Sequence, residues 1–187
     1  MLIGITGETG SGKTTMTNIL KRRLGYIVID GDELAHDVLT IERFNEVMSW
    51  FGYSPFESVN RKFLGELLFS NEELMQRYND FMYPLIKEKI DEIMSSSDSE
   101  GFIVDWNFLP STPLLNECDI TILMKCNENL RRERVKMRDG INDAYFNKRN
   151  RAGLKYQDGD YDYVFINEGE YALEESVSKR LEGVLWK

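Results

Sequence analysis

The first fourteen residues constrain the fold of this chain more than any other stretch. The apolar run at 2–6 is long enough for a strand and too short for most helices. Residues 7–14 then read Gly-Glu-Thr-Gly-Ser-Gly-Lys-Thr, which fills the G-x-x-x-x-G-K-[ST] template at every fixed position. A helical pattern follows and ends at Gly25; its apolar face holds Met16, Ile19, Leu20 and Leu24. Strand, glycine-rich loop and helix in this order predict a loop that binds a nucleoside triphosphate.

Each position of this loop has a predicted role. Its glycines permit backbone angles closed to other residues, so that successive N–H groups can form a nest for phosphate oxygens. Lys13 is expected to contact the β- and γ-phosphates, and the Thr14 hydroxyl to ligate Mg²⁺. The phosphates would lie at a helix N-terminus, which favours negative charge. The residues that we expect to hold the nucleotide here are Gly7, Glu8, Thr9, Gly10, Ser11, Gly12, Lys13, Thr14 and Thr15.

Length and charge limit what else the chain can be. Its 187 residues suit one α/β domain, and the 42% of hydrophobic residues can form a real core. The net charge of -9 argues against a general affinity for nucleic acid or anionic membranes. There is no apolar stretch of membrane-helix length, and the sequence starts directly in its first strand. We therefore expect a cytoplasmic protein, monomeric or weakly homo-oligomeric.

Cysteine and histidine are scarce. Cys118 and Cys126 fit neither redox nor zinc spacing, and we expect them to be reduced packing residues. His36 is the only histidine, so Ser-His-Asp catalysis and multi-histidine metal sites are almost excluded.

Two further strands end in aspartate. The strand predicted at 26–29 runs into Asp30-Gly31-Asp32, and the strand predicted at 102–104 is closed by Asp105. In open α/β sheets, ligands bind beyond the carboxyl ends of the strands. Asp32 is therefore a candidate functional carboxylate, although it could also cap the helix that follows. Asp105 has the form of a Walker-B residue, which helps to hold Mg²⁺, although many strands end in Asp.

The region between these strands reads as helical. We predict one helix over 33–51, a short one over 61–69 and a long one beginning at Asn71 as N-cap, which Pro84 should kink or restart. Strands are predicted at 120–124 and 163–166, with a closing amphipathic helix after Gly169. Strands that alternate with helices indicate a mostly parallel sheet covered on both faces.

One segment is basic in an acidic chain. Between 129 and 151 eight basic and three acidic residues give a local charge of 8 − 3 = +5, and the helix there ends at Gly140. A solvated helix face is one interpretation. We favour a hinged lid, because phosphoryl transfer needs cations over the transferring group. The basic residues are Arg131, Arg132, Arg134, Lys136, Arg138, Lys148, Arg149 and Arg151.

Several segments together resemble the dephospho-CoA kinases, a family of P-loop small-molecule kinases. The segment 3–14 is similar to the family's opening, and 28–36 to its Asp-Ala-Asp element. Residues 134–140 resemble its lid helix, and 162–169 its last strand and adenine-side turn. The likeness spans nearly the whole chain.

The resemblance implies a fold and a reaction. The fold is a three-layer α/β sandwich with five parallel strands, a helical substrate-binding region at 31–98 and a lid at 129–156, all in one domain over 1–187. The reaction transfers the γ-phosphoryl group of ATP, with Mg²⁺, to the 3′-hydroxyl of dephospho-CoA. Asp32 would then be the catalytic base and Arg138 a lid cation. Arg134 would also contact the nucleotide, with Asn167 and Gly169 close to the adenine.

The chain departs from the family pattern at five places. Glu8-Thr9 replaces Gly-Ile in the loop, and Tyr83-Pro84 replaces His-Pro. Asp105-Trp106-Asn107-Phe108-Leu109 stands where the family has Asp-x-Pro-Leu-Leu. The stretch at 39–41 is shortened, and near Asn150 the family has a Gln. The ATP side of the site thus matches the pattern better than the acceptor side.

Two other functions are compatible with the same loop. A nucleoside or nucleotide kinase would use Asp32 on a different acceptor, and a degenerate relative would bind nucleotide without catalysis. A GTPase switch is disfavoured, because the chain lacks the Asn/Thr-Lys-x-Asp motif that reads its base.

Overall fold

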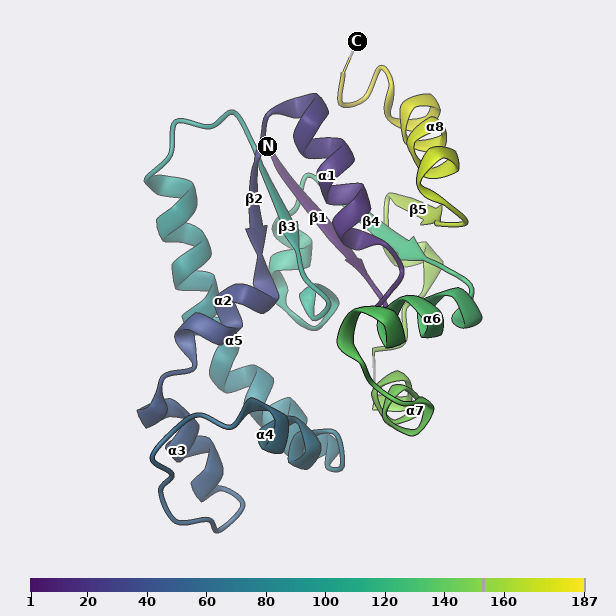
Figure 1. Cartoon of the computed structure of the whole chain (residues 1–187). Coiled ribbons are helices and arrows are strands. Elements are labelled where there is room, and N and C mark those ends of the chain that lie inside the picture. Colours follow the sequence, from purple (N-terminus) through teal and green to yellow (C-terminus); the bar gives the residue numbers. More distant parts are fainter. Residues whose placement is uncertain (153, 187) are drawn as a thin grey trace.

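Five parallel strands form one sheet in the order β2-β3-β1-β4-β5 (Figure 1). The computed structural model describes residues 1–152 and 154–186, apart from the side chains at 145, 148, 149, 151, 152 and 170. The strands are β1 (Leu2–Gly7), β2 (Ile27–Asp30), β3 (Phe102–Asp105), β4 (Ile120–Lys125) and β5 (Tyr163–Ile166). β1 is central, so Ile5 pairs with Asp105 on one side and with Ile122 on the other. The predicted five-stranded parallel sheet is confirmed.

Helices cover both faces of the sheet. On one face, α1 (Lys13–Leu24) and α8 (Glu170–Leu181) pack on a core that includes Ile3, Ile5, Ile103, Ile122 and Phe165. On the other, α2 (Gly31–Val38) and α5 (Glu72–Ser95) pack with α3 (Ile41–Ser49) and α4 (Arg61–Leu68) on a second core that includes Leu2, Ile29 and Val104. Neighbouring residues of one strand thus serve opposite cores, as the alternation of side chains along a strand requires.

The helical region contains one more break than predicted. The single helix expected over 33–51 is wrong, because α2 ends at Val38 and α3 begins at Ile41. Leu39 leaves the helical conformation at φ −80° and ψ 74°, and its side chain is buried. The hydroxyl of Thr40 then accepts a hydrogen bond from the Arg43 N–H and caps α3.

The proline in α5 does not restart the helix. α5 continues from Glu72 to Ser95 with Pro84 inside it. The cost of the proline is offset by Met82, Ile86 and Ile90, which are buried on both sides of it and anchor both halves of the helix to one core. Asn71 caps the start of α5 as predicted, since its side chain accepts a hydrogen bond from the Leu74 N–H.

Two helices lie at the carboxyl ends of the central strands (Figure 1). α6 (Glu128–Asp139) ends at Gly140, which adopts the left-handed conformation with φ 64°, and α7 (Asp143–Ala152) follows. They form the segment predicted as a lid; the side chains of Lys148, Arg149 and Arg151 lie outside the described residues. Short 3₁₀ turns at Leu109–Ser111 and Pro113–Glu117 link β3 to β4, and a third, Asp158–Asp160, precedes β5.

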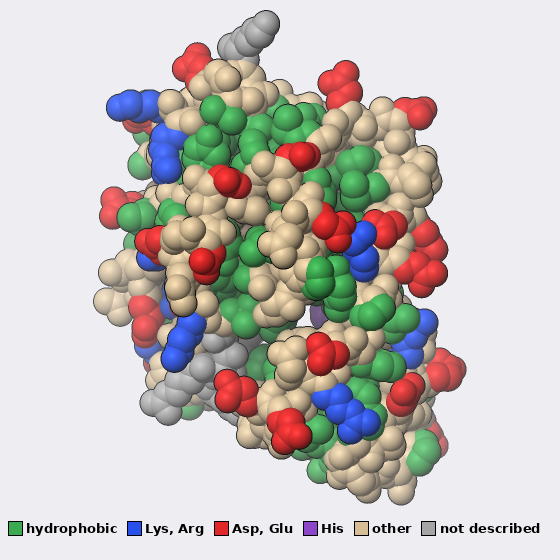
Figure 2. Space-filling model, turned by 180° about the vertical axis from the view of Figure 1, so that it is seen from behind, with side chains coloured by type: hydrophobic (Ala, Val, Ile, Leu, Met, Phe, Trp, Pro, Cys, Tyr) green, Lys and Arg blue, Asp and Glu red, His purple; other side chains and the backbone are tan. Residues whose placement is uncertain are grey.

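The surface is acidic and mixed. On the face in Figure 2, Asp and Glu side chains are spread widely and the basic ones are interspersed. A hollow in this view separates the body of the molecule from the lower lobe, where α3 and α4 lie in Figure 1. Within the described residues, no helix has the length and apolar character needed to cross a membrane.

Candidate active site

The glycine-rich loop between β1 and α1 is held closely by its surroundings. Gly7 and Gly12 have φ of 144° and 96°, which side chains rarely adopt. A Cβ on Gly7 would collide with the carbonyl oxygen of Met124, and one on Gly12 with the amide nitrogen of Asn167. The N–H of Ser11 donates to the Glu8 carbonyl at 3.0 Å and closes the turn. The loop therefore has the shape predicted for it, at the N-terminus of α1.

Lys13 lies inside this loop. Its Nζ donates to the carbonyl oxygen of Gly7 at 3.1 Å. Burial lowers the pKa of Lys13, and the nearby carboxylates of Asp105 and Asp32 oppose that shift. The ammonium group therefore lies inside the loop, within the electrostatic influence of both carboxylates.

Asp105 is the buried acid of the site. It ends β3, between the ends of β1 and β2, and its Oδ2 accepts a hydrogen bond from the Thr17 hydroxyl at 3.0 Å. Burial raises the pKa of Asp105 to about 6, against the effects of Lys13 and Thr17. Sequence reasoning missed Thr17, although the helical spacing from Lys13 places both side chains on one side of α1.

Asp30 and Asp32 have different surroundings. Oδ1 of Asp30 accepts hydrogen bonds from the N–H groups of Asp32 and Glu33 at 2.9 and 3.0 Å, so Asp30 is the N-cap of α2. Asp32 is therefore not the cap. Its Oδ2 accepts a hydrogen bond from Nδ2 of Asn107 at 3.3 Å. Its charge also acts on Lys13 and on Arg138, which places it among the cations of the site.

Three arginines of α6 lie in different positions relative to the loop. The helical spacing i, i+3, i+7 places Arg131, Arg134 and Arg138 on one side of α6. Arg134 donates to the carbonyl oxygen of Gly10 at 3.3 Å and to Sγ of Cys126 at 3.4 Å. The side chain of Arg138 is 60% exposed and forms two hydrogen bonds with Asp139, which raise its pKa together with the smaller effect of Asp32.

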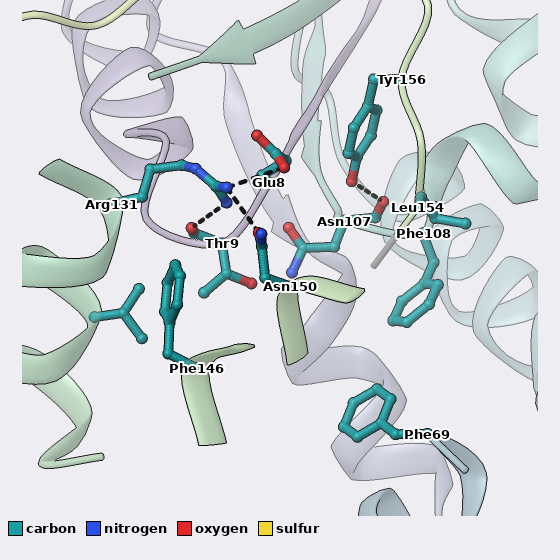
Figure 3. Close-up of a pocket in the computed structure, with 11 residues that line it drawn as sticks. Glu8, Thr9, Phe69, Asn107, Phe108, Arg131, Phe146, Asn150, Leu154 and Tyr156 are labelled. Atoms are coloured by element: carbon teal, nitrogen blue, oxygen red, sulfur yellow. Dashed lines mark hydrogen bonds and ion pairs between the residues drawn. The ribbon is translucent and has the colours of Figure 1, made fainter. Parts of the chain in front are cut away.

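Arg131 is the functional candidate that sequence reasoning missed. It is 3% exposed and donates to the Thr9 carbonyl at 3.3 Å and to Oδ1 of Asn150 at 2.7 Å. Its guanidinium also pairs with the carboxylate of Glu8 at 3.1 Å (Figure 3). The signal in the sequence was Glu8 itself, because an acid in a phosphate-binding loop needs a cation beside it.

Asn167 supports the loop from β5. It is 3% exposed, and its Nδ2 donates to the Ser11 carbonyl at 3.1 Å while its Oδ1 accepts from the N–H of Gly169 at 3.2 Å. The side-chain amide thus links the loop to the turn at 167–169.

Two cavities meet beside Asp32. The larger, of about 350 Å³, lies among α2, α4, α5 and the segment after β3, and its lining includes Asp32, Tyr78, Tyr83 and Trp106. Burial raises the pKa of the Tyr78 phenol to about 12. The smaller, of about 90 Å³, lies between the loop and the lid helices and is drawn in Figure 3. Phe69, Asn107 and Phe108 line both, so the two form one groove.

Comparison with known proteins decides the family. A model of the dephospho-CoA kinases matches residues 1–171. The chain belongs to the dephospho-CoA kinase family. A dephospho-CoA kinase of Borreliella burgdorferi is 26% identical over 202 residues, with 99% of this chain and 95% of the relative covered. One of Dehalococcoides mccartyi is 38% identical over 104 residues, with 54% and 52% covered.

Solved structures confirm the P-loop kinase fold. A Thermus thermophilus protein has a TM-score of 0.80 and 25% identity, with 97% of this chain and 95% of that chain covered. Dephospho-CoA kinase of Campylobacter jejuni has a TM-score of 0.58 at 23% identity, with 95% and 94% covered. A shikimate kinase of Bacteroides thetaiotaomicron has a TM-score of 0.56 at 18% identity, with 98% of each chain covered. The last two similarities concern the fold alone.

Two departures from the family pattern prove to be one structural feature. Gly31 stands where the pattern has alanine, and Trp106 follows Asp105 in the segment that replaces Asp-x-Pro-Leu-Leu. A Cβ on Gly31 would collide with Cγ of the Trp106 indole. The indole is 4% exposed and lines the larger cavity. The missing methyl group therefore makes room for a tryptophan in the acceptor groove.

Three further departures meet at Arg131. Glu8, Thr9 and Asn150 each differ from the family pattern, and each bonds to the same guanidinium. The cation neutralises the acid that this chain carries in its loop and ties that loop to α7. The side chains of Glu8 and Asn150 and the backbone carbonyl of Thr9 thus meet at one guanidinium.

Proposed function

We propose that this chain transfers the γ-phosphoryl group of ATP to the 3′-hydroxyl of dephospho-CoA, giving CoA. The observation that carries the proposal is the convergence of Lys13, Asp32 and Asp105 beside a groove large enough for an extended acceptor. Membership of the family supports the acceptor, since its relatives are named dephospho-CoA kinases.

In this proposal each cation of the site has a different role. Lys13 and N–H groups of the loop would hold the phosphates, because the Lys13 ammonium already lies against the Gly7 carbonyl inside the loop. Arg134, bonded to the Gly10 carbonyl, keeps α6 against the loop and lies within reach of the nucleotide. Arg138 is exposed near Asp32 and would lie over the transferring group when the lid segment 129–156 closes.

Asp32 is the proposed catalytic base. A base must lie within hydrogen-bond reach of the proton that it accepts. Asp32 lies in the first turn of α2 and lines the larger cavity, and its charge acts on both Lys13 and Arg138. Asp30 is used as the cap of α2, so its carboxylate is already engaged by two backbone N–H groups.

The residues at the end of β3 fit Mg²⁺. Mg²⁺ prefers hard oxygen ligands and usually binds one or two carboxylates together with substrate phosphates. Asp105 offers a buried carboxylate with a raised pKa, which a nearby cation would favour in its ionised form, and Thr14 offers a hydroxyl at the start of α1. The described residues contain no group of three or more His, Cys, Asp or Glu that could hold a metal alone. When bound, Mg²⁺ would neutralise phosphate charge.

The remaining parts of the proposal concern the binding of adenine and acceptor, the location in the cell and the oligomeric state. The adenine would lie against the backbone of Asn167 and Gly169, because the Asn167 amide is engaged by the loop. Helices in 31–98 would bind the acceptor within the single domain 1–187. We also propose a cytoplasmic monomer or weak homo-oligomer without nucleic-acid or membrane partners, which the charge of -9 supports.

A coupled assay of ADP release tests the acceptor directly. Purified protein would receive ATP, Mg²⁺ and either dephospho-CoA or one of the common nucleosides and nucleoside monophosphates. We expect dephospho-CoA to have the highest kcat/KM. The Lys13→Ala variant, prepared identically, controls for contaminating kinases. Far higher kcat/KM with a nucleoside or its monophosphate would replace the proposal by a nucleoside or nucleotide kinase. ATP binding without turnover of any acceptor would replace it by a non-catalytic role.

A further inference from the structure

The carboxamide of Asn107 stands where the two cavities of the groove join. It lines the larger cavity with Asp32 and the smaller one with Glu8 and Thr9 of the loop. In the family pattern this position is a proline, which has no hydrogen-bonding side chain. Asn107 is therefore a polar addition of this chain at the point where acceptor and phosphoryl group would meet.

The backbone of this residue is firmly held. Its carbonyl oxygen accepts hydrogen bonds from the Thr6 hydroxyl at 3.3 Å and the Tyr156 hydroxyl at 3.1 Å. The preceding N–H, of Trp106, donates to the carbonyl of Ile5 at 3.0 Å, and its indole packs against Gly31. The side chain thus extends from a backbone that is held in place, and Figure 3 shows it pointing away from Tyr156.

The two ends of the carboxamide are used differently. Nδ2 donates to Oδ2 of Asp32 at 3.3 Å. The opposite orientation would place the amide oxygen against a carboxylate oxygen, so the chemistry of Asp32 fixes which atom is which. Oδ1 is buried, and no residue in the described part of the chain donates a hydrogen bond to it. A buried acceptor without a donor costs folding free energy. In a ligand-binding site, a bound ligand can supply the missing donor.

We propose that Oδ1 of Asn107 accepts a hydrogen bond from a hydroxyl of the acceptor that neighbours the phosphorylated one, while Nδ2 positions Asp32. The proposal rests on the proposed function and adds a specificity determinant to it. With dephospho-CoA as acceptor, Asp32 would accept from the 3′-hydroxyl and Asn107 from the 2′-hydroxyl of the same ribose. The chain would then select a ribose over a 2′-deoxyribose.

The choice of a hydroxyl follows from the neighbours of the amide. Oδ1 can only accept, so its partner must carry an N–H or O–H group. Because Nδ2 of the same amide is bonded to Asp32, the partner must also lie next to the group that Asp32 contacts. On a sugar whose reacting hydroxyl contacts Asp32, the partner of Oδ1 would be the neighbouring hydroxyl. A site built to accept from a hydroxyl rejects the analogue that lacks it, since its own polar atom is then left unpaired.

The test compares kcat/KM for dephospho-CoA and for its 2′-deoxy analogue in three proteins. The unaltered protein should prefer the ribose by roughly ten- to a hundred-fold, the effect of leaving one buried polar atom unpaired. Asn107→Leu keeps the approximate shape without either hydrogen bond and should reduce the preference to within about threefold of unity. Asn107→Asp keeps an acceptor oxygen, so it should retain the preference while kcat falls with both substrates.

The ratio separates recognition from a merely structural role. A structural defect in Asn107→Leu would lower turnover of both acceptors equally and leave the ratio unchanged. If the variant is too weakly active, the same ratio is obtained from the dissociation constants of both acceptors, measured by calorimetry without ATP. An unchanged ratio in Asn107→Leu, or no preference in the unaltered protein, overturns this inference while turnover of dephospho-CoA upholds the proposed function. Absence of that turnover overturns the proposed function and the inference together.

Discussion

The two halves of the groove are the smaller cavity, on the ATP side, and the larger cavity, on the acceptor side. Residues that depart from the family pattern make different contacts in each half. On the ATP side, Glu8, Thr9 and Asn150 are all bonded to Arg131, and the loop keeps its shape around Lys13. On the acceptor side, the exchanges at 31 and 106–107 alter the wall of the cavity itself. Both sets of residues line the groove, but the first set is bonded to one guanidinium. The second set includes Oδ1 of Asn107, to which no described residue donates a hydrogen bond. We therefore expect the exchanges in the larger cavity to have the greater effect on what the groove binds.

The largest expected effect belongs to the lysine of the glycine-rich loop. Lys13→Ala should lower kcat by roughly 10³–10⁵-fold, because the residue is expected to balance charge that spreads over the transferring phosphates. Stability should hardly change, since within the described part of the chain the Lys13 ammonium donates one hydrogen bond, to the Gly7 carbonyl. Steady-state turnover and a thermal melt measure the two effects. A folded variant with near-normal turnover would contradict the assignment of the loop.

A variant of Asp32, where the two halves meet, tests the proposed catalytic base. Asp32→Asn keeps the shape and removes the proton acceptor, so kcat should fall by about 10²–10⁴-fold with little change in ATP affinity. The matched control is Asp30→Asn, because Asn also caps helices well and should preserve α2. Equal losses in both variants would show that the two carboxylates act through charge alone and would remove Asp32 from the role of base.

Gly31 tests whether the acceptor-side departures are coupled. In a helix, Gly→Ala is ordinarily stabilising by roughly 0.5–1 kcal/mol. Here the new methyl group would meet the Trp106 indole, and we expect a loss of about 1–3 kcal/mol of unfolding free energy. In a Trp106→Leu background the same change should be neutral or stabilising. Denaturant unfolding of the four proteins gives the coupling energy. Additive effects would mean that the two exchanges are independent.

The contrast between the halves also explains what the sequence could predict. The loop, Gly140 and the cap at Asn71 follow from rules about neighbouring residues, and all three are confirmed. The contact of Gly31 with Trp106 and the pairing of Glu8 with Arg131 join residues far apart in the chain. No local pattern encodes such contacts. The break between α2 and α3 was missed for a related reason, since burial of Leu39 in the tertiary core interrupts a helical pattern.

Arg131 tests the compensation proposed for the ATP side. Arg131→Met should raise the dissociation constant of ATP about tenfold, corresponding to about 1.4 kcal/mol, because the Glu8 carboxylate would then repel the phosphates. The effect is kept modest by solvent, since the Glu8 side chain is 38% exposed. Adding Glu8→Gly should restore much of the affinity. Isothermal titration with ATP measures both. Failure of the second change to rescue the first would show that Arg131 binds the nucleotide itself.

The last prediction concerns pH, and it is made for Asp105. Burial raises its pKa to about 6 in the folded protein, above its unfolded value of 3.8. Between these values the folded state binds more protons, so its contribution to stability is present below pH 3.8 and is lost as pH rises through about 6. Binding of Mg²⁺ and ATP should change in the opposite sense, weakening by up to roughly tenfold per pH unit below that point, because protonation removes the proposed ligand. Asp105→Asn should abolish the stability change while keeping the Thr17 hydrogen bond. Denaturant unfolding with a chelator at pH 4.5 and 7.5, beside titration of MgATP at both values, separates the two effects. If unfolding free energy and MgATP affinity change in the same direction, Asp105 is not the group that couples them.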